Sequence, residues 1–516
     1  MLFICHQVNG YAQPIVVNGI QEQIARERQL LGQWSLNHSF SVRPLKASPD
    51  LPISDSFFTW YDPKPLVTKN GSLPITIHPL KLETVFNSTR PYGWNNGSMI
   101  QAKGLGSRLS TGLHYSNGPF EFNLQPEWVM STNNNYSRTT LYGMPTQGTY
   151  SRIFAGQAYA NINLGKMKLG YSNQNLWWGP GQFSALLMSN NAPGFGHLHF
   201  SSREPIHTKP FDIEWQLIGG GLSQDSTLNA ENYSQQKGIH TNRWRYLNAM
   251  VISLHPNFMK GLYLGFTRSL QVYDNWFQNK KVGTFERYLP MVAQFFKKKI
   301  NTQANAPRAD DGRDQLASIF MRFVMPKSHF EFYFEYGYND FKDNMRDLVL
   351  DAQHSSAYIV GFKKIIPKQK DHYLSISGEI TQMAQPPDFV VRDAGNWYRH
   401  GQIRQGMTHM NQLLGAGSGL GNNVQTLQLE SVKSSQRLGF KIQRIQNDPR
   451  KQTLDVRNLW IVPIQWTDIT YGPVFHHQWK KIAASGEMQF VHSKNYGWSN
   501  QKKFNLFTAL NLTYSW

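Results

Sequence analysis

The sequence predicts an all-β protein, a transmembrane antiparallel β-barrel of about 18 strands with a short N-terminal helical segment. Three observations predict this fold. The chain of 516 residues contains no unbroken apolar stretch of about 18 residues, so membrane-spanning helices are not expected. From about residue 77, apolar and polar residues alternate with the period of a strand. Short turns also alternate along the chain with long connections.

Residues 1–13 resemble the end of a secretory signal peptide. They contain a short apolar run and a small-residue site at Tyr11-Ala12-Gln13, but no basic segment precedes the run. Cys5 is the single cysteine, which excludes a disulfide framework and a cysteine metal site. We expect residues 1–13 to be removed during export.

Residues 14–76 are predicted to form one helix and a linker, as a possible periplasmic plug. The segment 18–34 places Ile20, Ile24, Leu31 and Trp34 near one face at helical spacing, with Glu27 and Arg28 interrupting that face. The segment 42–65 is rich in proline and lacks periodicity, which is typical of a linker.

Residues 77–516 are predicted to form the barrel. In "FEFYFEYGY" (330–338), the alternate residues from Phe330 to Tyr338 are aromatic, while Glu331 and Glu335 lie on the opposite face. The final strand, "FNLFTALNLTYSW", places alternate residues from Phe504 to Trp516 on one face. A terminal aromatic residue on such a strand resembles the C-terminal signal of bacterial outer-membrane barrels, so we expect the chain in the outer membrane.

The connections support the barrel. Short ones include "LGK" (164–166), "PKS" (326–328) and "ASGE" (484–487). Long ones lie near 130–151, 173–195, 223–243, 271–314, 339–355, 383–424, 447–474 and 494–502. Outer-membrane barrels have short periplasmic turns and long extracellular loops. The strand count assumes that 97–115 is one strand bent at Gly104-Leu105-Gly106, and the connections 271–314 and 383–424 are long enough to fold inward.

Three aromatic segments fall in or beside long connections on the predicted extracellular side: "TRPYGWNNG" (89–97), "NLWWGPG" (175–181) and "NWYRHGQIRQG" (396–406). Aromatic planes suit the C–H faces of sugars, and Arg, Asn and His donate to hydroxyls and carboxylates. The predicted carbohydrate-binding residues are Arg90, Tyr92, Trp94, Trp177, Trp178, Asn190, Asn191, Trp397, Tyr398, Arg399, His400 and Arg404.

The two adjacent tryptophans have an alternative explanation. Tryptophans at membrane level usually form an interfacial belt, and Trp177 or Trp178 could also belong to a loop core. Because neighbouring residues of an extended segment point to opposite sides, we expect one ring to be buried and the other to be free to stack on a sugar.

These segments, together with "LLMSNNAPGF" (186–195) and "EYGYNDFKDNMRD" (335–347), resemble the Wzi-type capsule assembly proteins in the form common among Bacteroidetes-like bacteria. The resemblance extends from about residue 75 to the C-terminus. It implies an outer-membrane barrel of about eighteen strands with a helical N-terminal plug. It also implies a lectin-like role in attaching or organising capsular or exported polysaccharide at the cell surface. The chain departs from the family in offering one predicted helix where a small helical bundle is implied.

Charge also bears on the partner. The net charge of +19 favours an anionic partner, such as nucleic acid, lipopolysaccharide or an acidic polysaccharide. An outer-membrane location favours polysaccharide, outer-membrane lipid and lipopolysaccharide over nucleic acid. If Arg90, Arg399 and Arg404 hold an acidic glycan, salt should weaken its retention. The sequence leaves the oligomeric state open.

Catalysis has little support in the sequence. The motifs G-x-S-x-G, H-E-x-x-H and G-x-x-x-x-G-K-[ST] do not occur, and no cofactor or metal is expected. His476 and His477 are adjacent on a predicted strand and face opposite sides. Asp340, Asp343 and Asp347 could serve as glycosidase carboxylates, but are expected to pair with nearby cations. The favoured function is non-enzymatic polysaccharide binding, ahead of an anion-preferring diffusion porin and a surface glycosidase.

Overall fold

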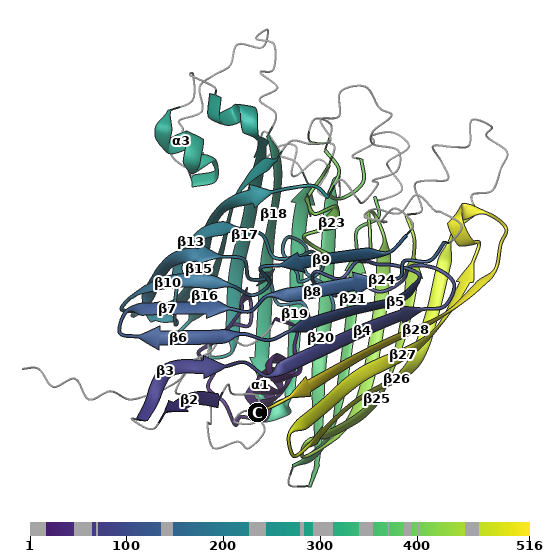
Figure 1. Ribbon diagram of the computed structural model, residues 1–516, viewed down its shortest axis with the longest axis horizontal. Coiled ribbons are helices and arrows are strands. Elements are labelled where there is room, and N and C mark those ends of the chain that lie inside the picture. The colour runs from purple at the N-terminus through teal and green to yellow at the C-terminus, as the bar shows by residue number, and fades with distance from the viewer. Residues whose placement is uncertain are drawn as a thin grey trace, which may run out of the picture.

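One antiparallel sheet dominates the protein, as its computed structural model shows (Figure 1). The structure describes residues 17–45, 64–68, 71–135, 148–225, 244–278, 283–292, 313–339, 354–369, 371–385, 395–400, 403, 405–448 and 464–516. Over these residues the sheet contains 24 strand segments. The predicted all-β barrel class is confirmed.

The second half of the sheet is a regular meander in which each strand pairs with the next. Its strands are β15 (Phe211–Leu222), β16 (Arg245–Pro256), β17 (Leu262–Tyr273), β18 (Asp314–Met325), β19 (Phe330–Asn339), β20 (Ser356–Gln369), β21 (His372–Gln382), β24 (Asn423–Lys433), β25 (Gln436–Gln446), β26 (Thr467–Trp479), β27 (Ile482–Lys494) and β28 (Lys503–Tyr514). The last strand, β28, pairs with β4 near the start of the sheet.

The first half consists of shorter segments. They are β2 (Lys64–Thr68), β3 (Gly71–Ile77), β4 (Leu80–Asn87), β5 (Gly104–Ser110), β6 (Leu113–Asn117), β7 (Phe120–Leu124), β8 (Glu127–Ser131), β9 (Tyr150–Phe154), β10 (Tyr159–Leu164), β11 (Met167–Ser172), β13 (His197–Ser202) and β14 (Ile206–His207). The segments β4, β5, β8 and β9 form one ladder with β28, whereas β3, β6, β7 and β10 form another that continues through β11 and β13 to β15.

These two ladders are joined by long strands that bend. For example, β5 and β6 follow one another with the bend at Thr111-Gly112, where a Cβ on Gly112 would lie 1.9 Å from the carbonyl oxygen of Leu124. The prediction of one strand over 97–115 with a bend at 104–106 is therefore wrong, since the strand begins at Gly104 and bends later. Because strands are interrupted in this way, the sheet has more segments than spanning strands.

The predicted alternation of short and long connections agrees with these boundaries, with two exceptions. The long connection predicted over 447–474 extends too far, because residues 467–474 belong to β26. The turn between β26 and β27 is Lys480-Lys481, so "ASGE" lies inside β27 and the prediction of a turn there is wrong. Gly486 is required by strand packing rather than by a turn, because a Cβ at this position would lie 2.4 Å from the carbonyl oxygen of Ala509 on β28. The glycine allows close approach of two strands.

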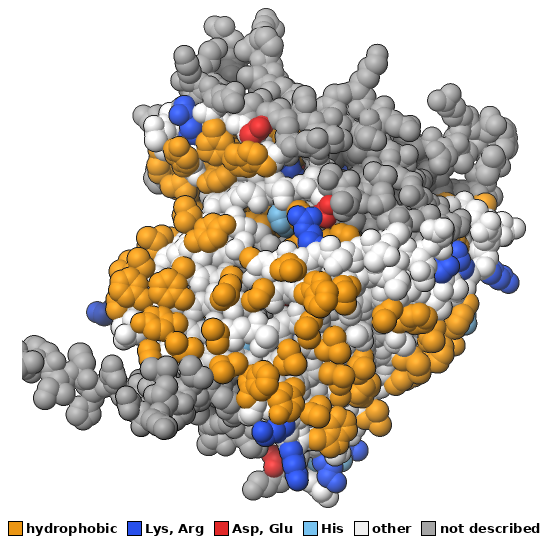
Figure 2. Space-filling view, in the orientation of Figure 1, with side chains coloured by type: hydrophobic (Ala, Val, Ile, Leu, Met, Phe, Trp, Pro, Cys, Tyr) orange, Lys and Arg blue, Asp and Glu red, His pale blue; other side chains and the backbone are white. Residues whose placement is uncertain are grey.

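Polar side chains face the interior of the sheet and apolar side chains face outward, which is the reverse of a water-soluble protein. On β19, Glu331, Tyr333 and Glu335 are fully buried, while the alternate aromatic residues face outward. Large apolar side chains cover the outer surface of the strands (Figure 2); Leu198 and Leu438 are both more than 60% exposed. An apolar exterior around a polar interior is the pattern of a barrel in lipid. None of the described helices is long and apolar enough to cross a membrane.

The helix α1 (Ile20–Leu30), 11 residues long, lies inside the sheet near its lower end in Figure 1, and its segment 17–45 is called the plug below. Leu30 packs in one cluster with Tyr263, Val324, Ile365 and Tyr373, which belong to the inner wall. The predicted helix over 18–34 is confirmed, with shorter bounds. The sheet itself begins with β2, inside the segment 14–76 that was predicted as helix and linker, and residues 46–63 lie outside the described part of the chain.

Candidate functional site

Two long connections fold inward and fill part of the lumen. Residues 173–196 and the described part of 395–422 contribute to one hydrophobic cluster with the inner wall of β15, β16, β18, β19 and β20. The second connection contains the short hairpin of β22 (Thr408–His409) and β23 (Gln412–Leu413). The expectation that the 383–424 connection folds inward is confirmed for its described residues.

The connection 271–314 behaves differently. Its described part contains the 3-10 turn η1 (Asp274–Gln278) and the helix α3 (Thr284–Tyr288). Trp276 and Met291 pack on Leu270 and Val272. Leu270 and Val272 belong to β17 and lie on the face opposite to Tyr263. Because Tyr263 packs with Leu30 of α1 inside the barrel, Leu270 and Val272 point outward. Although this connection is long enough to fold inward, its described residues cover apolar side chains on the outer face.

The tryptophan pair forms a short strand of its own. Residues Trp177–Trp178 (β12) pair with Val42–Arg43 (β1), inside the segment predicted as linker. Both tryptophans are fully buried. The indole nitrogen of Trp178 donates to Gln216 Oε1 at 2.9 Å. The prediction that one ring is free is wrong, because Trp177 packs with Val17 and Ala185, and Trp178 packs in the cluster that includes the wall.

Arg43 fixes the turn that follows the tryptophans. Its Nη2 donates to the carbonyl oxygens of Gly179 at 2.8 Å and Gly181 at 3.0 Å, and its Nη1 pairs with Glu22 on α1. The guanidinium thus joins α1 to the "GPG" turn. Sequence reasoning missed this residue because a proline-rich segment gave no periodic pattern.

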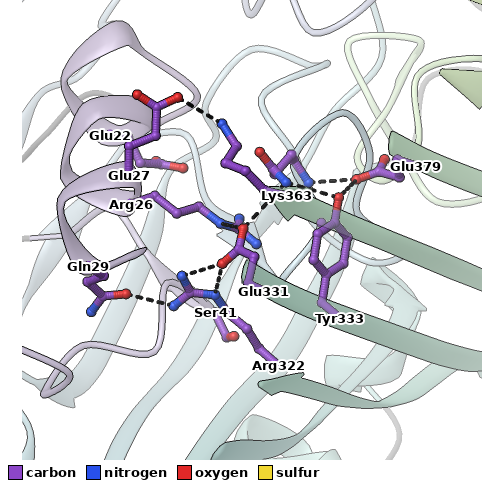
Figure 3. Close-up of polar contacts among 12 residues, drawn as sticks. Glu22, Arg26, Glu27, Gln29, Ser41, Arg322, Glu331, Tyr333, Lys363 and Glu379 are labelled. Atoms are coloured by element: carbon purple, nitrogen blue, oxygen red, sulfur yellow. Dashed lines mark hydrogen bonds and ion pairs between the residues drawn. The ribbon is translucent and has the colours of Figure 1, made fainter. Parts of the chain in front are cut away.

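Buried ion pairs hold α1 against the inner wall (Figure 3). Glu27 accepts hydrogen bonds from Arg437 Nη2 at 2.7 Å, Lys363 Nζ at 3.1 Å and the Tyr373 hydroxyl at 2.7 Å. Burial alone would raise the pKa of the Glu27 carboxyl, but Arg437 and Lys363 hold it well below its usual range. Glu27 is therefore ionised at neutral pH and couples the helix to two distant strands.

A second group of charges extends this anchor. Arg26 Nε donates to Glu331 Oε1 at 2.6 Å, and the other oxygen of Glu331 accepts from Arg322 at 2.6 Å. Arg322 also donates to Gln29 Oε1 at 2.9 Å (Figure 3). Of the two residues predicted to interrupt the apolar face of α1, Glu27 therefore binds the helix to the inner wall, whereas Arg28 donates to Gln33.

Arg90 is held in place by an ion pair and by aromatic rings. Its Nη2 lies 2.8 Å from Asp468 Oδ2. Its guanidinium carbon lies 5.4 Å from the ring centroids of Tyr92 and Tyr496 and 5.6 Å from that of Trp466. The side chain is almost fully buried, so it ties the 88–97 segment to β26.

Asn191 and Tyr398 join the inward segments to one another. Asn191 accepts from the Asn95 amide at 3.1 Å and donates to the Leu413 carbonyl at 2.9 Å. The Tyr398 hydroxyl donates to the Leu186 carbonyl at 2.6 Å. Trp397 is also buried here, whereas Arg399 is exposed, His400 is half-buried and Arg404 lies outside the described residues.

Three predicted residues reach a cavity. Tyr92, Trp94 and Asn190 line a space of about 360 Å³ between the start of α1 and the inner wall of β4, β5 and β24–β28. This volume lies within the range of roughly 300–1,000 Å³ that is typical of small-ligand sites. The cavity, with its aromatic, amide and charged lining, is the candidate functional site.

The fold defines a plugged outer-membrane β-barrel, with an apolar exterior, an internal helix and an occupied lumen. The family model for the capsule assembly protein Wzi matches residues 95–505, so the chain belongs to this family. No curated protein matches it in sequence. The chain resides in the outer membrane, as its family and its apolar exterior indicate.

The chain is also similar to solved structures. One is Wzi of Escherichia coli, described as an outer-membrane protein involved in group 1 capsule assembly and as a carbohydrate-binding β-barrel. It is 12% identical, with a TM-score of 0.63, over 98% of this chain and 100% of that chain. Acinetobacter baumannii OccAB4 is 8% identical, with a TM-score of 0.42, over 87% of this chain and 99% of that one.

Proposed function

We propose that this chain binds and organises capsular or exported polysaccharide at the cell surface, as a lectin-like barrel without enzymatic activity. The observation that carries the proposal is the cavity lined by Tyr92, Trp94 and Asn190 inside the plugged barrel. Family membership supports the connection to capsule assembly. The description of the Escherichia coli protein as carbohydrate-binding supports the ligand class.

The packing of the lumen favours binding over diffusion. A porin needs a continuous aqueous channel, whereas α1 and the inward segments pack directly against the wall of this barrel.

The carboxylates of the cavity favour a non-enzymatic role. A glycosidase needs one protonated carboxyl and one carboxylate facing the bond to be cleaved, but Glu83, Glu430 and Glu487 are each paired with a cation.

The proposal is tested on cells. A strain that lacks the protein should release polysaccharide that the parent strain retains, and the parent gene should restore retention. Trp94→Ala should restore it poorly, because this half-buried ring lines the cavity. Trp479→Ala is the matched control, since Trp479 is exposed at the end of β26 away from the cavity. Equal retention with and without the protein would refute the proposed function.

A further inference from the structure

The cavity is lined by elements that are far apart in the sequence. The first residues of the plug, including Asn18 and Gln23, form one side, and Tyr92 to Asn96 with Asn190 form another. The wall is formed by inward residues of β4, β5 and β24–β28. Gln23 Nε2 donates to Glu430 Oε2 at 2.8 Å, so the plug is fastened to this wall.

Gln489 is the most informative residue of this wall. It lies on β27, is 1% exposed and lines the cavity. Neither its amide nitrogen nor its amide oxygen has a hydrogen-bond partner among the described residues. Burying an amide without partners is unfavourable, so such a group beside a cavity is expected to complete its hydrogen bonds with water or with a ligand.

Two further amides show the same deficit. The side-chain oxygens of Asn95 and Asn190 are buried, line the cavity and have no partner in the described part of the chain. With Gln489, the cavity therefore presents three acceptor oxygens and one amide donor group that are unsatisfied. Hydroxyl groups can donate to such oxygens, whereas the oxygens of a carboxylate or phosphate cannot.

The charges of the cavity are already compensated. Arg108 lies 2.6 Å from Glu83, Arg437 Nε lies 3.3 Å from Glu430, and Lys441 pairs with Glu487. All six of these residues line the cavity, giving three cations and three anions. An acidic ligand would have to break one of these ion pairs to obtain a counter-charge. The net charge of +19 therefore does not describe this cavity.

From these observations we propose that the cavity holds a neutral, hydroxyl-rich sugar unit of the bound polysaccharide, with Gln489 hydrogen-bonding its hydroxyls. Tyr92 and Trp94, whose ring centroids lie 5.9 Å apart, supply the aromatic part of the lining. This inference rests on the proposed function and specifies its ligand. It differs from the expectation of an acidic glycan held by arginines, because Arg90 pairs with Asp468.

The test uses the purified full-length protein in detergent, titrated with glucose, galactose or mannose and, separately, with glucuronate. Binding is followed by intrinsic tryptophan fluorescence at low and high salt. We expect at least one neutral hexose to bind with an affinity that salt does not change, and glucuronate to bind more weakly. Gln489→Leu, which keeps the side-chain size, should weaken hexose binding about tenfold or more.

The control is Gln436→Leu, which alters an exposed glutamine at the start of β25 and should leave hexose binding unchanged. Heat-modifiability on gels establishes that both variants are folded. Preferential binding of glucuronate, absence of hexose binding, or parent-like affinity in folded Gln489→Leu would overturn the inference. If hexose binding fails while cells still need the protein to retain polysaccharide, the inference alone falls; if retention does not depend on the protein, the proposed function falls.

Discussion

The guanidinium of Arg43 lies over the indole of Trp177, with its central carbon 4.8 Å from the ring centroid. The same guanidinium pairs with Glu22 of α1 and donates to the carbonyl oxygens that follow the tryptophan pair. The plug and the "NLWWGPG" motif are thus parts of one structural unit. The tryptophans contact the N-terminal segment and the barrel wall rather than solvent.

Truncating either tryptophan should therefore impair folding. Trp177→Ala and Trp178→Ala should each lower the free energy of unfolding by about 3–5 kcal/mol, as for other large buried aromatic residues. The measurement is the fraction of heat-modifiable protein in the outer membrane, with Trp479→Ala as the exposed control. Normal amounts of folded protein in either variant would show that its ring is not part of the core.

Arg43 should be difficult to replace. Arg43→Met keeps much of the side-chain volume but leaves Glu22 without its paired cation and two buried carbonyl oxygens without the Arg43 donor, which should destabilise the plug by about 3–5 kcal/mol. Arg43→Lys should recover only part of the loss, because an ammonium cannot reproduce the planar fork of donors. Limited proteolysis of the N-terminal segment provides the measurement. Equal protease resistance in Arg43→Met and the parent would contradict this role.

The sequence predicted the barrel because the relevant signals are local. The alternation on β19 and the short turns at 164–166 and 326–328 depend only on neighbouring residues. The attachment of the plug could not be predicted in this way. Glu27 and Arg437 are 410 positions apart in the sequence. A charged residue on an otherwise apolar helix face therefore gives no indication in the sequence of the residue that it pairs with. The identification of Gln489 likewise required the unsatisfied amide and the cavity.

The attachment of α1 should depend on acid. The pKa of Glu27 is depressed in the folded protein, so its contribution to stability is fully present above the ordinary carboxyl value of about 4.3. It is lost as the pH falls from there towards the depressed folded value, because protonation removes the charge that Arg437 and Lys363 require. Protease release of the N-terminal segment should rise over this acid range.

Glu27→Gln should remove the part of this acid dependence that belongs to residue 27. The variant should also be less protease-resistant at neutral pH, because it removes the negative charge that Lys363 and Arg437 share and leaves Arg437 with Glu430 alone. Glu204→Gln, on the exposed turn between β13 and β14, is the control and should behave like the parent. An unchanged acid profile in Glu27→Gln would assign the transition to other groups.

The lumen should conduct ions poorly. Two obstructions lie in it: α1 with its ion pairs, and the cluster formed by residues 173–196 and the described part of 395–422. In planar bilayers we therefore expect currents near the baseline at neutral pH. Deleting residues 17–31 should raise the current only modestly, because the second cluster packs on the wall through Trp178, Tyr398 and Leu413 without using Leu30. The deletion variant is compared with the parent only where both are heat-modifiable. Large, steady currents from the intact protein would mean that the lumen is open, and would favour the anion-preferring porin over the polysaccharide-binding barrel.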